Sequence, residues 1–424
     1  METVDKETGE IKQAPKGKGS FWISKKAIAQ LIADKATAME IGAYLVLAKH
    51  TDESGQFSTA GVQAVYRATG VGHAVAQRAI DRLCQVKGPQ TTKGKSKAVW
   101  NLVYPAGTWA SLTGLDLPHG PIKAAQVRWV LNDYGAGPED RVWISNELID
   151  GHGKFTQPLK RLKRCGDVAA RLLLVCYQQS SLEQMGGINP LPNGFAYTYD
   201  MSKVKRNVHG YDLWHGVGKS VTGWGAATVL GVSKFSNDDD EKEDQIAPYW
   251  QAIESLDSAG FVYQVVTVMD AEAGHEEAQA IYELDTKSRH GYKPIGEHGL
   301  GGATARLSHH LGNPVADANG RLYGRYAAIV PAGVQPHITG IYRLRFRVAN
   351  PKNHGVKGAW ARIHNSQKEA QEWIEDLAAK EGVELQPSDK GQASKIATDP
   401  KQSPEDLSRA SIDIGNRHPF NNLF

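Results

Sequence analysis

The chain has 424 residues, enough for two or three domains, and 41% of them are hydrophobic, so it can bury a sizeable core. It has no run of about 18 apolar residues and starts with a polar segment, so we expect neither a membrane span nor a secretory signal. Its three cysteines, Cys84, Cys165 and Cys176, form no CxxC pair, which predicts a reducing bacterial cytoplasm and argues against a disulfide frame or a zinc finger.

The net charge of +3 is small because basic and acidic regions alternate along the chain. Between positions 15 and 106, 13 Lys or Arg stand against 5 Asp or Glu, a net of +8. Between 142 and 290 there are 14 against 20, a net of −6, and between 321 and 364 there are 8 against none. This asymmetry predicts two surfaces that face nucleic acid and one that does not.

Residues 1–20 are expected to form a flexible arm. Two helices are predicted after it, at 25–34 with Ser24 as its cap and at 38–49. Two shorter helices follow in the stretch 57–83. Thr59 is expected to cap the first of these, at 60–69, in which Val62, Val65 and Tyr66 form an apolar face.

Gly70-Val71-Gly72 ends that helix, because glycine adopts a left-handed turn without steric cost. The outward side of the helix that follows carries four candidate base-reading residues: His73, Gln77, Arg78 and Arg82. The run ATGVGHAVAQRAIDRL at 68–83 closely resembles helix-turn-helix motifs of bacterial regulators and replication initiators. The resemblance implies that the second helix fits the major groove of DNA. An ordinary helical pair in a core is the alternative, and the exposed Gln and Arg favour DNA binding.

A β-hairpin is predicted at 86–105, with a tip rich in Gly and Lys and a strand at 98–104. Helix, helix-turn-helix and hairpin follow one another in the order of a winged-helix domain, which we place at 21–106. The alternative for the tip is a solvated loop. Beside a recognition helix, the wing lysines are expected to neutralise DNA phosphates: Lys87, Lys93, Lys95 and Lys97.

A second, expanded winged helix is predicted at 142–290, after a linker at 107–141 that holds one short helix or strand around 124–131. VWIS at 142–145 echoes FWIS at 21–24, and VAARLLLVCY at 168–177 echoes IGAYLVLAKH at 41–50. Segments 261–269 and 280–284 are expected to form its wing. A helix starting at 238 opens with four acidic residues, which suit a helix N-terminus but not a phosphate surface, so we expect this module to dimerise or to dock a protein. A basic run has two interpretations, contact with a DNA backbone or a solvated helix face: Lys160, Arg161, Lys163 and Arg164.

No sequence pattern indicates a catalytic, metal or nucleotide site. The run GVGKS at 216–220 has Leu213 where a phosphate-binding loop needs its first Gly, so we interpret it as a turn. The 15 histidines show no metal-ligand spacing, and no catalytic triad or carboxylate pair stands out. We therefore predict that the protein is not an enzyme and holds no metal or cofactor, although an active site assembled from distant residues is the minor hypothesis.

The region 291–382 is expected to form a basic element. Residues 342–348 alternate as a strand would, with Tyr342 and Leu344 toward a core and Arg343, Arg345 and Arg347 on the other face. Phosphate is the expected partner of these arginines, and the acidic residues of the second module are the alternative. A helix is predicted at 366–380 and a disordered tail at 383–424, whose end, Phe420 to Phe424, resembles sliding-clamp-binding peptides.

The predicted fold class is α+β, with tandem winged-helix modules, a basic C-terminal α/β element and disordered termini. The tandem order resembles replication initiators of plasmids and mobile elements, which carry two such modules and often dimerise. We therefore expect a cytoplasmic, sequence-specific protein that binds double-stranded DNA. A transcriptional repressor using the same helix-turn-helix, or an assembly subunit whose winged helices bind proteins, are the alternatives. Expected protein partners are a second copy of the chain, or a protein bound by the second module or by the terminal peptide.

Overall fold

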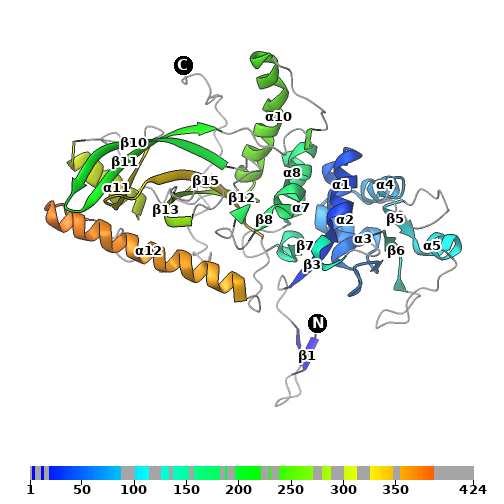
Figure 1. The fold of residues 1–424 in the computed structure, drawn as a ribbon. Helices are drawn as coiled ribbons and strands as arrows, with labels where there is room; N and C mark the ends of the chain where they lie inside the picture. Colours follow the sequence, from blue (N-terminus) through cyan, green and yellow to red (C-terminus); the bar gives the residue numbers. More distant parts are fainter. Residues whose placement is uncertain are drawn as a thin grey trace.

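The computed structural model describes most of the chain between residues 2 and 385. The described residues are 2–4, 11–13, 19–86, 101–113, 126–132, 137–151, 157–181, 187–188, 196–220, 229–230, 238–270, 279–287, 300–312, 325–346 and 354–385. They form a mixed α and β structure in which a helical part and a six-stranded sheet lie side by side (Figure 1). No helix within these ranges is long and apolar enough to cross a membrane.

Side chains cap the first two helices; the cap at Ser24 was predicted, whereas the one at Thr37 was not. Ser24, the last residue of β3 (Ser20–Ser24), accepts the N–H of Ala27 at 3.0 Å and begins α1 (Lys25–Ala33). Thr37 and Glu40 form a reciprocal capping box at the start of α2 (Ala38–Lys49). Helix α2 is buried on nearly every side because other helices pack around it, so it is the centre of the first hydrophobic core.

The predicted pair of short helices is present as α3 (Val62–Thr69) and α4 (His73–Leu83). Gly70 joins them with a left-handed φ of 65°, which confirms the predicted turn. Helix α4 buries Ala76, Ala79, Ile80 and Leu83. Its opposite side therefore faces solvent.

Two local expectations for α3 were wrong. Thr59 does not cap it, because its hydroxyl donates to the carbonyl of His50 and the helix begins two residues later with Gly61 as an N-cap without a side-chain bond. Tyr66 is 41% exposed, since α3 packs through Val65 instead.

A small antiparallel sheet completes the first half of the helical part. Its order is β4–β6–β5, with β6 (Trp129–Leu131) between β4 (Phe57–Ser58) and β5 (Val103–Pro105). The N–H of Leu102 donates to the carbonyl of Val86 at 2.7 Å, but β5 pairs with β6, and residues 87–100 of the predicted hairpin lie outside the described residues. The short helix or strand expected around 124–131 is the strand β6, but 107–141 is not a plain linker, because β6 supplies backbone hydrogen bonds to both neighbouring strands and α5 (Ala106–Thr113) lies before it.

The two echoing segments found in the sequence pair with each other. Strand β3 lies antiparallel to β7 (Arg141–Ser145), with Trp22 opposite Trp143. Helix α8 (Asp167–Gln178) then packs on α2, its counterpart in the first half. One apolar core runs through both halves, so they are not separate domains.

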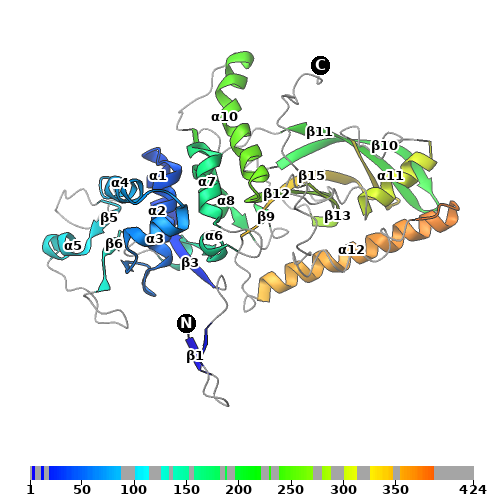
Figure 2. The same ribbon diagram turned by 180° about the vertical axis from the view of Figure 1, so that it is seen from behind.

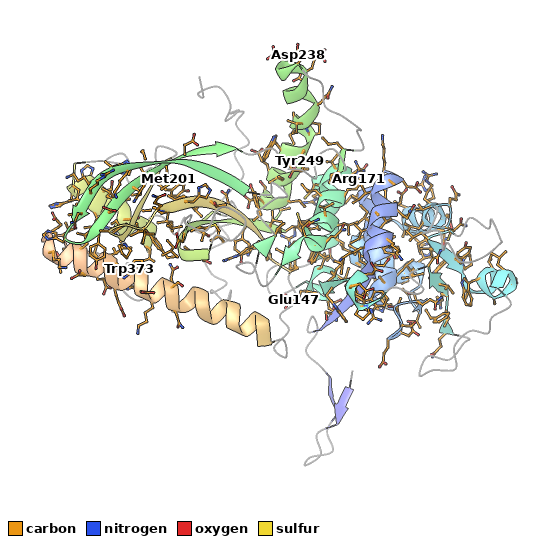
Figure 3. The ribbon with its side chains drawn as sticks, in the orientation of Figure 1. Glu147, Arg171, Met201, Asp238, Tyr249 and Trp373 are labelled. Atoms are coloured by element: carbon orange, nitrogen blue, oxygen red, sulfur yellow. The ribbon has the colours of Figure 1, made fainter. Side chains whose placement is uncertain are left out.

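Further helices belong to the second half, residues 141–287. They are α6 (Glu147–Asp150), α7 (Pro158–Cys165) and α10 (Asp239–Ser258). Asp238 caps α10 by accepting the N–H groups of Asp240 and Glu241. Asp238 lies at the free end of α10, away from the rest of the molecule, whereas Tyr249 lies where α10 meets α8 (Figure 3).

The second half and the C-terminal region share one six-stranded sheet. Its order is β13–β12–β15–β10–β11–β14, all antiparallel. The strands are β10 (Ala196–Val208), β11 (Tyr211–Ser220), β12 (Val262–Asp270), β13 (Gln279–Lys287), β14 (Arg325–Pro331) and β15 (Pro336–Leu344). The expected hairpin of β12 and β13 exists, but β12 also pairs with β15 over nine residues. A domain boundary at 290 is therefore wrong, because it would divide this sheet.

The side chain of Tyr282 links the two edge strands of the sheet. Its hydroxyl bonds both the N–H and the carbonyl of Ile329, at 2.9 and 3.1 Å, although β13 and β14 are at opposite ends of the strand order. Helices α11 (Leu300–His310) and α12 (His354–Lys380) pack on both edge strands and fill the second core. Seen from behind, α12 runs along the sheet (Figure 2).

The chain ends also differ in part from expectation. The arm contains a two-stranded hairpin of β1 (Glu2–Val4) and β2 (Ile11–Gln13). Helix α12 begins twelve residues earlier than predicted. One short pair of strands, β8 (Ser180–Ser181) and β9 (Gly187–Ile188), and a helical turn at Pro138–Asp140 complete the described elements. The terminal peptide lies outside the described residues.

Candidate nucleic-acid interface

The open side of α4 carries the residues that the sequence singled out. His73 and Arg78 are exposed. Gln77 is half-buried, and its Nε2 donates to Oδ1 of Asp81 at 2.8 Å. The guanidinium of Arg82 lies 3.7 Å from the carboxylate of Glu40 on α2. The four predicted residues thus lie outside the buried side of α4, and Glu40 offsets part of the positive charge of Arg82.

The start of α4 is suited to an anion. Its N-cap, Gly72, has no side chain, so no side-chain acceptor satisfies the first N–H groups of the helix. The helix dipole adds partial positive charge at this end. His73 is the first helical residue and is exposed there. A phosphate or the electronegative edge of a base is a suitable ligand for this end of the helix.

The predicted wing can be located only through its base. Lys87, Lys93, Lys95 and Lys97 lie outside the described residues. Val86 directly follows the last turn of α4, and it is hydrogen-bonded to Leu102. The residues that flank the lysine-bearing segment, Val86 and Asn101, therefore lie near each other, next to the C-terminal end of α4.

The arginine strand does not form the open cationic face that its alternation suggested. Arg343 is 3% exposed, and its Nη2 donates to Oε1 of Glu283 at 2.7 Å. Arg345 is half-buried, donates its Nε to the carbonyl of Gly260 at 2.9 Å and lies over the ring of Tyr263. The prediction for Arg343 was wrong because both faces of the sheet are covered at this point; Arg347 lies outside the described residues.

The alternative partner, an acidic residue of the second module, is confirmed for Arg343. The partner of Arg343 is Glu283 on β13, two strands away in the sheet order, and not the acidic start of α10. The backbone of Glu283 is held in turn by Gln367 of α12, which bonds its N–H at 2.7 Å and its carbonyl at 2.8 Å. Only the pairing of distant strands brings these residues together.

The basic run at 160–164 divides between two environments. Arg161 turns inward, where its Nη1 donates to the carbonyl of Ala259 at 2.8 Å and its guanidinium lies over Phe261. Burial lowers the pKa of Arg161 below its ordinary value, and the nearby Arg345 lowers it further. Lys160, Lys163 and Arg164 are exposed. The sequence signal for this split was present in the helical spacing of Leu159 and Leu162, which are buried.

Other candidate chemistry is not supported by geometry. The run 216–220 lies within β11 and pairs with β10, so it is neither the turn that we expected nor a loop before a helix. Among the described residues, no group of three His, Cys, Asp or Glu side chains could hold a metal ion.

Comparison with known proteins gives no relative. No family model matches the chain, and neither a curated protein nor a solved structure matches it.

Proposed function

We propose that the protein binds double-stranded DNA in a sequence-specific manner through a winged helix formed by residues 38–132. The observation that supports this best is the connection of its elements. Helix α2, strand β4, helices α3 and α4, and strands β5 and β6 follow in this order, with α5 between β5 and β6, and β6 inserts between the other two strands. In this assignment α4 is the recognition helix, and the segment 87–100, which carries the predicted wing lysines, connects α4 to β5.

The exposed side of α4 supports base reading. In helix-turn-helix proteins the N-terminal residues of the second helix contact base edges while the first helix crosses the backbone. His73, Gln77 and Arg78 occupy these positions. Arg can bond guanine and Gln can bond adenine through two hydrogen bonds each, which gives sequence choice.

The internal repeat favours a replication initiator over a regulator. The paired strands β3 and β7, and the packed helices α2 and α8, relate two halves of one chain as the subunits of a dimer are related. Under this proposal, the two halves correspond to the two modules that initiators use. The repressor assignment predicts one palindromic site, whereas the initiator assignment predicts repeated sites in an origin.

The test is selection of bound sequences from random double-stranded DNA with the full chain, followed by mapping of bound sites on host and plasmid DNA. Enrichment of one motif, present as an array of repeats, would support the initiator proposal. Enrichment of a single palindrome near promoters would support the repressor instead. Binding without any enriched motif, or no binding at low salt, would overturn the proposed function and favour a protein-assembly role.

A further inference from the structure

A cationic helix face of the second half lies directly against the helix-turn-helix of the first. A Cβ atom at Gly70, in the turn between α3 and α4, would lie 2.9 Å from Cδ and 3.3 Å from Cε of Lys160. The aliphatic part of the Lys160 side chain therefore covers the turn. Helix α7 also packs along α3 and α2, so its position relative to the helix-turn-helix is fixed by more than one contact.

Helix α7 separates its charges from its apolar contacts. Leu159 and Leu162 are buried, and the exposed positions 160, 163 and 164 fall within an arc of about 100° on the other side. Within the described part of the chain, none of these three cations takes part in an ion pair. The helix itself contains no acidic residue. Three cations without an ion-pair partner among the described residues thus share one face of α7, which lies beside α3 and the turn at Gly70.

We propose that Lys160, Lys163 and Arg164 bind phosphates of the same DNA duplex whose major groove receives α4. This inference rests on the proposed function and extends the DNA surface into the second half of the molecule. The first helix of a helix-turn-helix crosses the DNA backbone, and α7 lies beside that helix and over the turn that follows it. Phosphate contacts of this kind give affinity without sequence choice.

Under this proposal the second half contributes to DNA binding although its net charge is negative. It presents one basic helix face toward the duplex, while the acidic start of α10 points away at the free end of its helix (Figure 3). A recognition helix of its own is then unnecessary. Arg161 takes no part, because it is held inside by Ala259 and Phe261.

The test is the salt dependence of DNA binding by the full chain. Lys163→Gln with Arg164→Gln removes two exposed charges that have no ion-pair partner among the described residues. The slope of log affinity against log salt should fall by about two, on the selected site and on random DNA alike. Between 50 and 200 mM salt the variant should lose about tenfold less affinity than the unaltered protein.

Two further variants make the result specific. Lys160→Met keeps an aliphatic side chain on Gly70 and should reduce the slope by about one without changing the melting temperature. Arg206→Gln with Lys368→Gln removes the same charge from exposed positions on β10 and α12, and should leave the slope unchanged.

The outcomes separate this inference from the proposed function. If Arg78→Ala weakens specific binding but the α7 variants keep the original slope, the α7 surface is excluded and the recognition helix is retained. An equal fall in the control variant would also overturn the inference, because net charge alone would explain it. No binding by the unaltered protein at low salt would overturn both proposals.

Discussion

Arg343 and Glu283 form a buried ion pair between β15 and β13, although 60 residues separate them in the chain. Strand β12 lies between their strands, so the pair spans it. Tyr263 of β12 also hydrogen-bonds the guanidinium. The pair is part of the interior of the sheet, next to the Gln367 contact with α12.

Arg343→Gln should lower the free energy of unfolding by about 3–5 kcal/mol, because it leaves the carboxylate of Glu283 buried and unpaired. Chemical denaturation measures this loss. Combining Arg343→Leu with Glu283→Leu should restore much of the stability, since no charge is then left buried. Arg345→Gln is the matched control and should cost about 0.5–1.5 kcal/mol, the contribution of one hydrogen bond. Equal losses for Arg343→Gln and Arg345→Gln would contradict the importance of the ion pair.

Arg78→Ala should weaken binding to the selected site by about 1–3 kcal/mol and weaken binding to random DNA less, because its guanidinium is expected to read a base. Fluorescence anisotropy on both DNA duplexes gives the comparison. Arg206→Ala removes an exposed arginine of β10 and should change neither affinity. Equal losses on both duplexes for Arg78→Ala would show that this residue contacts phosphate only.

Replacing Lys93, Lys95 and Lys97 with Ala should weaken binding to all sequences and reduce the salt slope by about one for each phosphate that a lysine no longer neutralises. The physical reason is that these lysines lie in the segment that follows the recognition helix α4, where they are expected to neutralise backbone phosphates. Titrations at several salt concentrations measure the slope. A slope identical to that of the unaltered protein would show that these lysines do not contact DNA.

Gly55→Ala should destabilise the fold by about 1–3 kcal/mol, because Gly55 has a φ of 69° and a Cβ atom there would overlap the indole ring of Trp22. Trp22 is the β3 residue opposite Trp143, so the change would disturb the pairing of the two halves. Gly107→Ala, in α5 with no atom within 4 Å of the added Cβ, should be neutral or stabilising by up to about 1 kcal/mol. Thermal denaturation of both variants tests the contrast, and similar melting temperatures would refute it.

The carboxylate of Asp212 should make the stability of the fold depend on pH. Burial by itself would raise its pKa, but the ammonium of Lys203 and the N–H groups of Asn207 and Gly333 hold the pKa below its ordinary value of 3.8. A carboxylate with a lowered pKa in the folded state stabilises the fold fully above its ordinary pKa. That contribution is lost as the pH falls through the lowered value.

Asp212→Asn should therefore lower the melting temperature at pH 7, and its difference from the unaltered protein should shrink below about pH 4. Thermal denaturation across this pH range measures the difference. A gap that stays constant, or that widens in acid, would show that charge on Asp212 does not stabilise the native sheet.

The local elements of the helical part follow from the sequence alone. Ser24, Thr37 and Gly70 act over three or four residues, through caps and a turn, so the starts of α1 and α2 and the joint before α4 could be predicted. The exposed side of α4 could also be predicted, because helical periodicity separates its buried alanines from His73 and Arg78. The echo of FWIS in VWIS was visible too, although its meaning as a strand pair was not.

Tertiary structure decided what periodicity cannot express, which is the partner of each strand. The polar face of an alternating strand can face solvent or a second layer of structure, and the sequence does not distinguish the two. Arg343 was therefore predicted to bind DNA, whereas in the structure it is enclosed by β12, β13 and α12. A short helix or strand was expected around 124–131, but the sequence could not show that β6 pairs with both β4 and β5, because three apolar residues carry no information about their hydrogen-bond partners. The contact of Lys160 with Gly70 likewise joins segments 90 residues apart, and only the packing of α7 on α3 makes them one surface.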